Sequence, residues 1–191
     1  YFADSRSLGN DDPILISDLA MAEFKAGLYA ECLMTLRELE ITSKQGLTTL
    51  QRRTRGKCFA ATGRLIEGRD LCLSITRETP QDADAWVDLG YIAWKMGDYR
   101  RLNMCGETIS RLAPTRWEGP LFVGKAAQIA ENDDLVIQSL TRAASLTEND
   151  ELSRWIASAV NDATEKSTSV LQDAPNMAVN TAEIEPEEPS K

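Results

Sequence analysis

The chain has 191 residues, 42% of them hydrophobic and 27% charged, which is typical of a globular protein with one folded domain and room for a terminal extension. Its formal net charge of −9 argues against nucleic-acid binding by the molecule as a whole, since such affinity comes largely from neutralising phosphates. The sequence contains no histidine, which excludes the Ser-His-Asp and Cys-His catalytic arrangements and the usual zinc sites.

No run of about 18 apolar residues occurs, so we expect no transmembrane segment in this chain. The four cysteines (Cys32, Cys58, Cys72 and Cys105) are widely spaced and form no Cys-x-x-Cys pair, which favours free thiols over disulfides. These features predict a cytoplasmic protein. Because the chain opens at Tyr1 and not at a methionine, an N-terminal signal or anchor removed upstream stays open as an alternative.

The chain divides into three parts by composition. Residues 1–12 are polar and unpatterned and predict a flexible N-terminal segment, after which Asp12 and Pro13 form a helix-start signal. Helical periodicity dominates residues 13–165, with no alternating strand pattern. Residues 166–191 contain three prolines, no aromatic residue and an excess of acidic side chains, which predicts a disordered acidic tail.

The clearest repeat signal is AWVDLGYIAWKMGDYRRLNMCGETISRLAP, residues 85–114. In it Trp86 precedes the Leu89-Gly90 pair, Gly97 interrupts the helical pattern, and Pro114 closes a second helix. This arrangement resembles a tetratricopeptide repeat (TPR), a helical hairpin of about 34 residues. At an offset of 34 residues towards the N-terminus, a second copy of the same pattern recurs with Gly56, Gly63 and Pro80 at the matching positions.

The resemblance extends over four repeats, of which the outer two are degenerate. The expected repeats are residues 13–46, 49–82, 83–116 and 117–150, followed by a capping helix over 151–165 whose Leu152, Trp155, Ile156 and Ala159 share one face. In the fourth repeat Glu131 stands where the turn glycine is expected. The resemblance implies an all-α fold, a right-handed superhelix of stacked hairpins.

Glycines are expected at two kinds of position in such hairpins. Gly56, Gly90 and Gly124 should let the two helices of one hairpin approach closely. Gly27, Gly63 and Gly97 should end first helices in the left-handed conformation.

TPR proteins bind extended or helical peptides in a concave groove lined by their first helices, so the resemblance implies such a groove here. Val87, Tyr91 and Trp94 share the corresponding face of the clearest repeat. The same steps in the neighbouring repeats complete the predicted partner-binding set, which is Arg53, Lys57, Val87, Tyr91, Trp94, Leu121, Lys125 and Gln128. Its basic and aromatic residues predict an acidic peptide partner with an apolar anchor.

The basic stretch LQRRTRGKC, residues 50–58, leaves alternatives open. Arg53 and Lys57 point nearly the same way on a helix, whereas Arg52 and Arg55 diverge from them. The cations could instead be ordinary solvated charges. In a further alternative the helix is rotated, with Leu47, Leu50, Thr54, Cys58 and Ala61 facing inward, and the groove assignment of Arg53 and Lys57 is then wrong.

Two further points limit the groove hypothesis. Trp94 could be held between neighbouring first helices and unavailable to a ligand. The two-carboxylate clamp of chaperone-binding TPR proteins is excluded, because Asp88 stands where that clamp has an asparagine.

We therefore expect a non-catalytic protein-protein interaction module, such as an adaptor, an assembly factor or a chaperone-like scaffold. No Gly-x-Gly-x-x-Gly, P-loop or calcium-loop motif occurs, so we expect no cofactor, metal or small-molecule substrate. One alternative is a structural homo-oligomer that associates through Trp117 and Trp155. The least favoured alternative is nucleic-acid binding through the cluster from Arg52 to Lys57. The acidic tail is a candidate to fold back onto the groove in cis.

Overall fold

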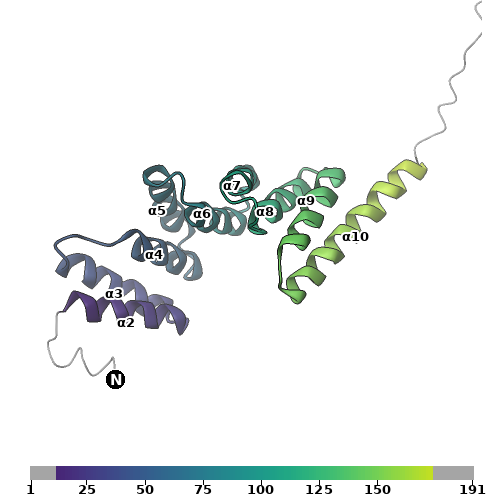
Figure 1. The fold of residues 1–191 in the computed structure, drawn as a ribbon. Helices are drawn as coiled ribbons and strands as arrows, with labels where there is room; N and C mark the ends of the chain where they lie inside the picture. The colour runs from purple at the N-terminus through teal and green to yellow at the C-terminus, as the bar shows by residue number, and fades with distance from the viewer. Residues whose placement is uncertain (1–11, 174–191) are drawn as a thin grey trace, which may run out of the picture.

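The structure is a computed structural model that describes residues 12–173. This part of the chain is all-helical, without strands, and forms an elongated stack of antiparallel hairpins (Figure 1). The hairpins are α2 (Pro13–Lys25) with α3 (Tyr29–Thr42), α4 (Thr49–Ala61) with α5 (Leu65–Glu78), α6 (Ala83–Met96) with α7 (Tyr99–Leu112), and α8 (Glu118–Ile129) with α9 (Asp133–Leu146). A long helix, α10 (Asp150–Asp173), packs on α9 and closes the stack. The predicted all-α solenoid with a C-terminal capping helix is confirmed.

The helix boundaries follow the local signals in the sequence. The Asp12 carboxylate accepts a hydrogen bond from the Ile14 amide at 2.9 Å, with Pro13 as the first helical residue of α2. Gly97 ends α6 at φ 70°, as expected of a left-handed C-cap. Pro114 follows the end of α7 by two residues. Each hairpin therefore falls within one of the expected repeats.

The turn between α8 and α9 uses a residue poorly suited to its backbone conformation. Glu131 has φ 54° and stands at the position that Gly97 occupies one repeat earlier. It is the one non-glycine residue with positive φ in residues 12–173. The fourth hairpin therefore keeps the turn geometry of the others at a local energetic cost of roughly 1–2 kcal/mol.

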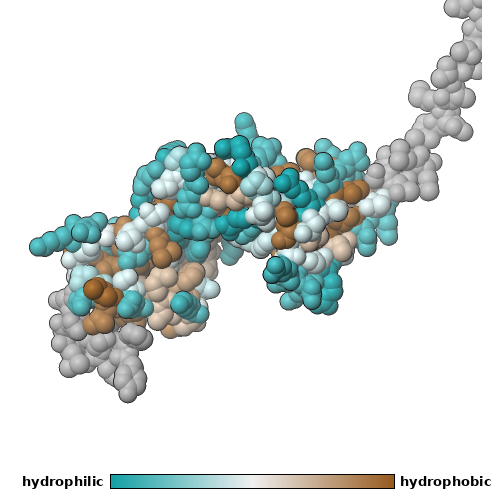
Figure 2. Space-filling model, viewed as in Figure 1, coloured by the Kyte–Doolittle hydropathy of each residue, from teal (hydrophilic) through white to brown (hydrophobic). Residues whose placement is uncertain are grey.

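Two clusters of buried side chains hold the stack together. The smaller one joins α2, α3 and α4 and contains Ile16, Ala20, Cys32, Leu36, Leu39 and Cys58. The larger one extends from Cys72 in α5 to Ala163 in α10. All four cysteines are free of disulfides, as predicted, and all four are buried. On the face shown in Figure 2, hydrophobic surface gathers over α2, α3 and α4, and the surface over α6 to α9 is more mixed.

The close-approach glycines act as predicted at two positions out of three. A Cβ atom at Gly56 would lie 3.0 Å from the Cys72 sulfur, and one at Gly124 would lie 2.5 Å from a methyl of Leu140, each within its own hairpin. At Gly90 the prediction was wrong, because its Cβ would lie 2.2 Å from the ring of Phe122 in the next hairpin. Gly90 therefore admits a large ring between hairpins.

Helix α10 is longer than the predicted capping helix and continues past residue 165 to Asp173. Ile156 and Ala163 are buried against the stack, whereas Trp155 is 43% exposed. The predicted flexible segment 1–12 lies outside the described residues except for Asp12. The predicted tail, 166–191, lies outside them beyond Asp173, so its proposed return to the groove in cis also stays untested.

Candidate functional site

A groove of about 380 Å³ lies between the first helices α4 and α6, with Arg116 of the connection before α8 at its edge. Four members of the predicted partner-binding set line it, namely Arg53 and Lys57 from α4 and Val87 and Tyr91 from α6. Tyr91 is 40% exposed, and Val87 is buried. The remaining lining residues are Ala60, Asp84, Asp88, Ile92, Lys95 and Arg116. The structure thus brings half of the predicted set into one continuous surface.

The aromatic floor of the groove is held by its neighbours in α6 and α8. The Tyr91 ring meets Phe122 edge to face with centroids 5.1 Å apart, and it lies nearly parallel to Trp94 at 6.5 Å. Phe122 is fully buried because Gly90 leaves room for its ring. A ring fixed on two sides loses little conformational freedom when a ligand covers it.

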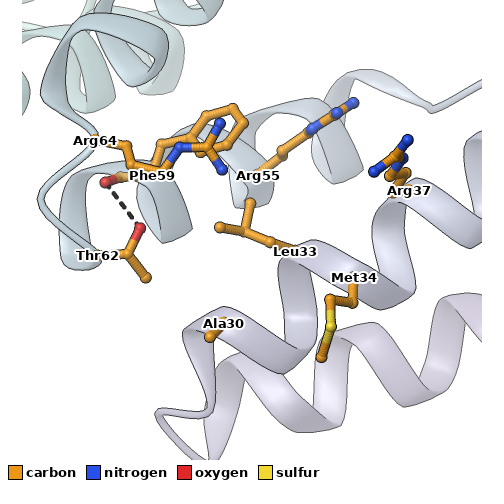
Figure 3. A pocket seen from close by; sticks show the side chains of 8 residues that line it. All are labelled: Ala30, Leu33, Met34, Arg37, Arg55, Phe59, Thr62 and Arg64. Atoms are coloured by element: carbon orange, nitrogen blue, oxygen red, sulfur yellow. Dashed lines mark hydrogen bonds between the residues drawn. The ribbon is translucent and has the colours of Figure 1, made fainter.

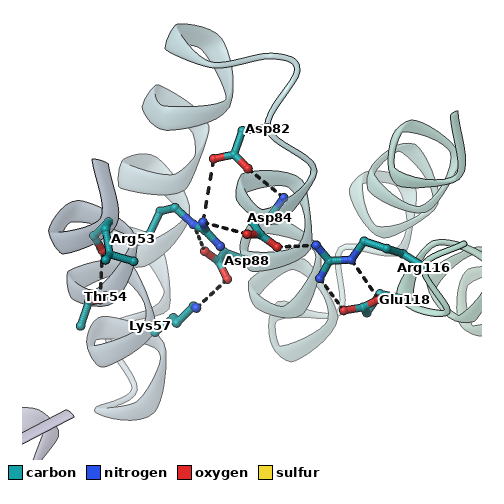
Figure 4. A network of polar contacts seen from close by, with 9 residues as sticks. Arg53, Thr54, Lys57, Asp82, Asp84, Asp88, Arg116 and Glu118 are labelled. Atoms are coloured by element: carbon teal, nitrogen blue, oxygen red, sulfur yellow. Dashed lines mark hydrogen bonds and ion pairs between the residues drawn. The ribbon is translucent and has the colours of Figure 1, made fainter. Parts of the chain in front are cut away.

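Asp88 lines the groove and binds the two basic residues of α4 that also line it, Arg53 and Lys57 (Figure 4). It is only 5% exposed, and its carboxylate accepts a hydrogen bond from Arg53 Nε at 2.6 Å and forms an ion pair with Lys57 Nζ at 3.1 Å. Arg53 also pairs with Asp84 at 3.3 Å and is 14% exposed, whereas Lys57 is 43% exposed. Burial lowers the Arg53 pKa, but the hydrogen bond to Asp88 and its charge outweigh this and raise it.

A second arginine extends the network towards α8. Arg116 donates to Asp84 and, through Nη2 at 2.7 Å, to Glu118, which is buried (Figure 4). The hydrogen bond to Glu118 raises the Arg116 pKa above its ordinary value, and the Asp84 bond adds to the rise. The hydrogen bond from Arg116 in turn lowers the pKa of Asp84. Ion pairs therefore connect α4, α6 and the start of α8 across the floor of the groove.

This network changes the electrostatic interpretation of the groove. Arg53 and Lys57 were expected to be free cations or ordinary solvated charges, yet both bind Asp88, and Arg53 is largely buried. The acidic members of the network, Asp82, Asp84, Asp88 and Glu118, match its cations in number once Lys95 on the rim is included. The groove is consequently close to neutral, with Lys57 and Lys95 as its exposed cations.

The other two basic residues of the 50–58 stretch point elsewhere. Arg52 pairs with Glu78 of α5 through Nη2 at 2.7 Å, and Arg55 pairs with Glu40 of α3 at 2.8 Å. The predicted divergence of Arg52 and Arg55 from Arg53 is therefore observed. Thr54 and Cys58 are buried as the rotated-helix alternative required, but Leu50 is 58% exposed and Arg53 and Lys57 still line the groove. The groove assignment of Arg53 and Lys57 and the rotated-helix alternative are therefore each correct for part of α4.

The second half of the predicted set meets α10 and leaves no open surface of the expected kind. Leu121 is 2% exposed and belongs to the core. Trp94 packs on Phe122 of α8 at 6.3 Å and on Trp155 of α10 at 6.4 Å, so these two helices hold it and leave it only partly exposed. The sequence suggested Trp155 as a self-association contact and did not indicate that it packs on Trp94.

Lys125 and Gln128 belong to this same covered region. The Lys125 ammonium lies 5.6 Å from the Trp94 ring centroid and 5.1 Å from that of Trp155, and it donates to the Gln128 side chain at 2.6 Å. Burial lowers the pKa of Lys125. These contacts fix α10 against α6 and α8. The candidate site is therefore limited to the part of the predicted set around Tyr91, namely Arg53, Lys57, Val87 and Tyr91.

Five residues of the network were not predicted as site residues, namely Asp82, Asp84, Asp88, Arg116 and Glu118. Asp84 lies in the first turn of α6, Arg116 follows Pro114 in a connection, and Glu118 begins α8. One signal for them exists in the sequence, because acidic residues of one repeat lie about 34 positions from basic residues of the adjacent repeat. The residues of 12–173 contain no group of three or more acidic or cysteine side chains placed to bind a metal. None of the described helices is both long and apolar enough to traverse a bilayer.

Comparison with known proteins identifies the fold but no close relative. No family model matches the sequence, and no curated protein matches it significantly. Among solved structures, residues 41 to the end of MamA from Desulfovibrio magneticus RS-1 superpose with a TM-score of 0.65 at 17% identity, covering 84% of this chain and 93% of that one. YrrB, described as a TPR protein with an unusual peptide-binding site, gives 0.67 at 10% identity, covering 82% and 80%.

A third similar structure is the type III secretion chaperone SycD of Yersinia enterocolitica, bound to a peptide of the translocator YopD. It gives a TM-score of 0.59 at 15% identity and covers 65% of this chain and 99% of that one. At such identities the likeness establishes the fold alone. The fold is that of TPR proteins, as the 34-residue pattern predicted.

Proposed function

We propose that this chain, whose fold is that of TPR proteins, is a non-catalytic module that binds a segment of another protein in the groove between α4 and α6. The observation that carries the proposal is the half-exposed ring of Tyr91 at the centre of this groove. Aromatic residues on a rigid support are the usual energetic anchors of protein interfaces. An adaptor, assembly factor or chaperone-like scaffold would use such a surface.

The groove supports a partner with one apolar side chain and an acidic flank. The apolar side chain would cover Tyr91, with Ala60 and Val87 beside it. A carboxylate of the partner would pair with Lys57 or Lys95 on the rim, because both are exposed. Asp88 keeps its 2.6 Å bond to Arg53 when Lys57 turns to a partner, so this exchange leaves no buried charge unpaired.

The similar structures support the same kind of activity. SycD is described in complex with a peptide, and YrrB with a peptide-binding site. A cytoplasmic location, no cofactor and no small-molecule substrate stay predictions of this proposal.

A catalytic role finds no support in the absence of a histidine base or in the thiols of Cys58, Cys72 and Cys105. The sequence has no histidine to act as a base. Burial raises the thiol pKa of both Cys72 and Cys105 to about 12, so neither forms a thiolate at neutral pH. The hydrogen bond with Cys32 and burial likewise raise the pKa of Cys58.

Nucleic-acid binding through the cluster from Arg52 to Lys57 also has little support. Each of its four cations pairs with a carboxylate, and they face three different helices. A phosphate backbone would have to displace those carboxylates one by one.

The experiment is affinity capture from an extract of the source cells with the wild-type chain, Tyr91→Ala and Met104→Ala. Met104 on α7 is 42% exposed, close to the 40% of Tyr91, and lies outside the groove, so it is the matched control. We expect one set of proteins to be retained by wild type and Met104→Ala and lost with Tyr91→Ala, with far-UV circular dichroism unchanged. Equal capture by all three chains would refute the groove proposal.

A further inference from the structure

A second and larger groove, of about 480 Å³, lies on a different face of α4, between α3 and the start of α5 (Figure 3). Its apolar lining is Leu33 and Met34 of α3 and Phe59 of α4. Met34 is 60% exposed, and hydrophobic surface gathers around these helices in Figure 2. In a helix with 3.6 residues per turn, Arg55 and Phe59 lie well away from Arg53 and Lys57, so the two grooves are separate.

Three arginines surround this apolar lining. Arg37 projects from α3, Arg55 from α4, and Arg64 from the turn before α5 (Figure 3). The guanidinium of Arg64 lies 4.4 Å from the Phe59 ring centroid, and that of Arg55 lies 5.7 Å from it. Arginine stacked on an aromatic ring keeps its N–H donors directed outwards for a carboxylate.

The positive charge of this groove is only partly neutralised. Arg55 pairs with Glu40 and Arg64 with Glu67, and both carboxylates are 49% exposed. Arg37 makes no hydrogen bond or ion pair with any residue of 12–173. The Nε atom of Arg55 is buried and has no hydrogen-bond partner there either. This groove therefore differs from the Tyr91 groove, whose cations are matched in number by carboxylates, of which Asp88 and Glu118 are buried.

The same chain carries a segment with the complementary chemistry. Residues 182–188, AEIEPEE, place Ile184 among four glutamates, Glu183, Glu185, Glu187 and Glu188. We propose that this acidic segment of a second copy of the chain docks in the groove of Arg37, Arg55 and Arg64. Ile184 covers Met34 and Phe59, and the glutamates pair with the arginines.

The occupant comes from a second copy because of where α10 ends. In Figure 1 the C-terminal end of α10 lies at the far end of the stack from α3, with α5 to α9 between them. The ten residues 174–183 reach at most about 35 Å when fully extended, which is roughly the length of the 24-residue α10. The segment is therefore too short to return along the stack to α3 of its own chain. Docking in trans links copies end to end or in reciprocal pairs, and added salt weakens it.

The test measures average mass by light scattering over a concentration series, at low and high salt, using the full chain. We expect the wild-type mass to rise with concentration at low salt. The rise should disappear in a chain with Glu183, Glu185, Glu187 and Glu188 all changed to Gln, a variant that leaves the described helices untouched. A constant wild-type mass, or association that persists in the glutamine variant, would overturn the proposal.

A peptide titration locates the surface. A labelled peptide of residues 180–191 is titrated with the full chain carrying the four Glu→Gln changes, so that the chain's own segment does not compete. We expect the double variant Arg37→Glu, Arg64→Glu to raise the Kd at least about tenfold. Each of the two changes removes an attraction to the glutamates and adds a repulsion. Arg77→Glu makes a like change per residue on an exposed part of α5 outside the groove and should leave Kd nearly unaltered. Equal weakening by Arg77→Glu would contradict the assignment, and Tyr91→Ala should leave this binding intact.

Discussion

Replacing Asp88 by asparagine tests the charge network that shapes the Tyr91 groove. The change keeps the size of the side chain but removes the charge that binds Arg53 at 2.6 Å and Lys57 at 3.1 Å. Losing one partner of a buried ion pair costs about 3–5 kcal/mol. Arg53 retains Asp84 at 3.3 Å and Lys57 can turn to solvent, so we expect a loss of about 2–3 kcal/mol in the free energy of unfolding.

The free energy of unfolding is measured by urea unfolding followed by circular dichroism. In a thermal scan we expect the melting temperature to fall by about 4–12 °C. Asp84→Asn is the control, because Asp84 is 51% exposed and its removal should cost only about 1 kcal/mol. Asp88→Asn also leaves the groove more positive, so an acidic partner should bind it more tightly than wild type. A stability change within about 0.5 kcal/mol would refute the central role of Asp88.

The remaining predictions concern packing, a turn and acid sensitivity. Gly90→Ala should lower the free energy of unfolding by about 2–3 kcal/mol, because its methyl overlaps the buried ring of Phe122; an unchanged urea midpoint would contradict that packing. Glu131→Gly should raise the stability by about 0.5–1 kcal/mol, measured by the melting temperature, because φ 54° suits glycine; a lower value would show that the turn is not strained. Since Arg116 lowers the folded-state pKa of Asp84, this carboxylate contributes stability above the ordinary aspartate pKa of about 4, and the contribution is lost as the pH falls towards the lowered value. The urea midpoint of Asp84→Asn should therefore fall less than that of wild type between pH 5 and pH 3, and parallel curves would contradict the assignment.

The hairpins were predictable because their signals are local. Gly97 acts at the end of α6 and Pro114 just after the end of α7. The same signals recur 34 residues earlier at Gly63 and Pro80. Gly90 was assigned the wrong partner because the identity of a contact across hairpins depends on how they stack. Nothing near Gly90 in the sequence indicates that Phe122, in the next hairpin, fills the space above it.

The sequence indicated which residues share a surface in the candidate site, but not whether their charges are paired. Helical spacing correctly placed Arg53, Lys57 and Tyr91 on one surface. Whether a cation is free depends on carboxylates from other helices, and Asp88 lies 35 positions from Arg53. The covering of Trp94 by α10 was missed for the same reason, because a capping helix has no fixed crossing angle that its own sequence reveals.

The most direct test of the central claim is photo-crosslinking from the groove itself. Benzoylphenylalanine is placed at position 91 in one chain and at position 104 in another, and each is irradiated in an extract of the source cells. We expect specific adducts with a protein partner from position 91, absent from position 104 and reduced by Lys57→Glu. Adducts from position 104 alone, or none from position 91 in a folded chain, would contradict the claim.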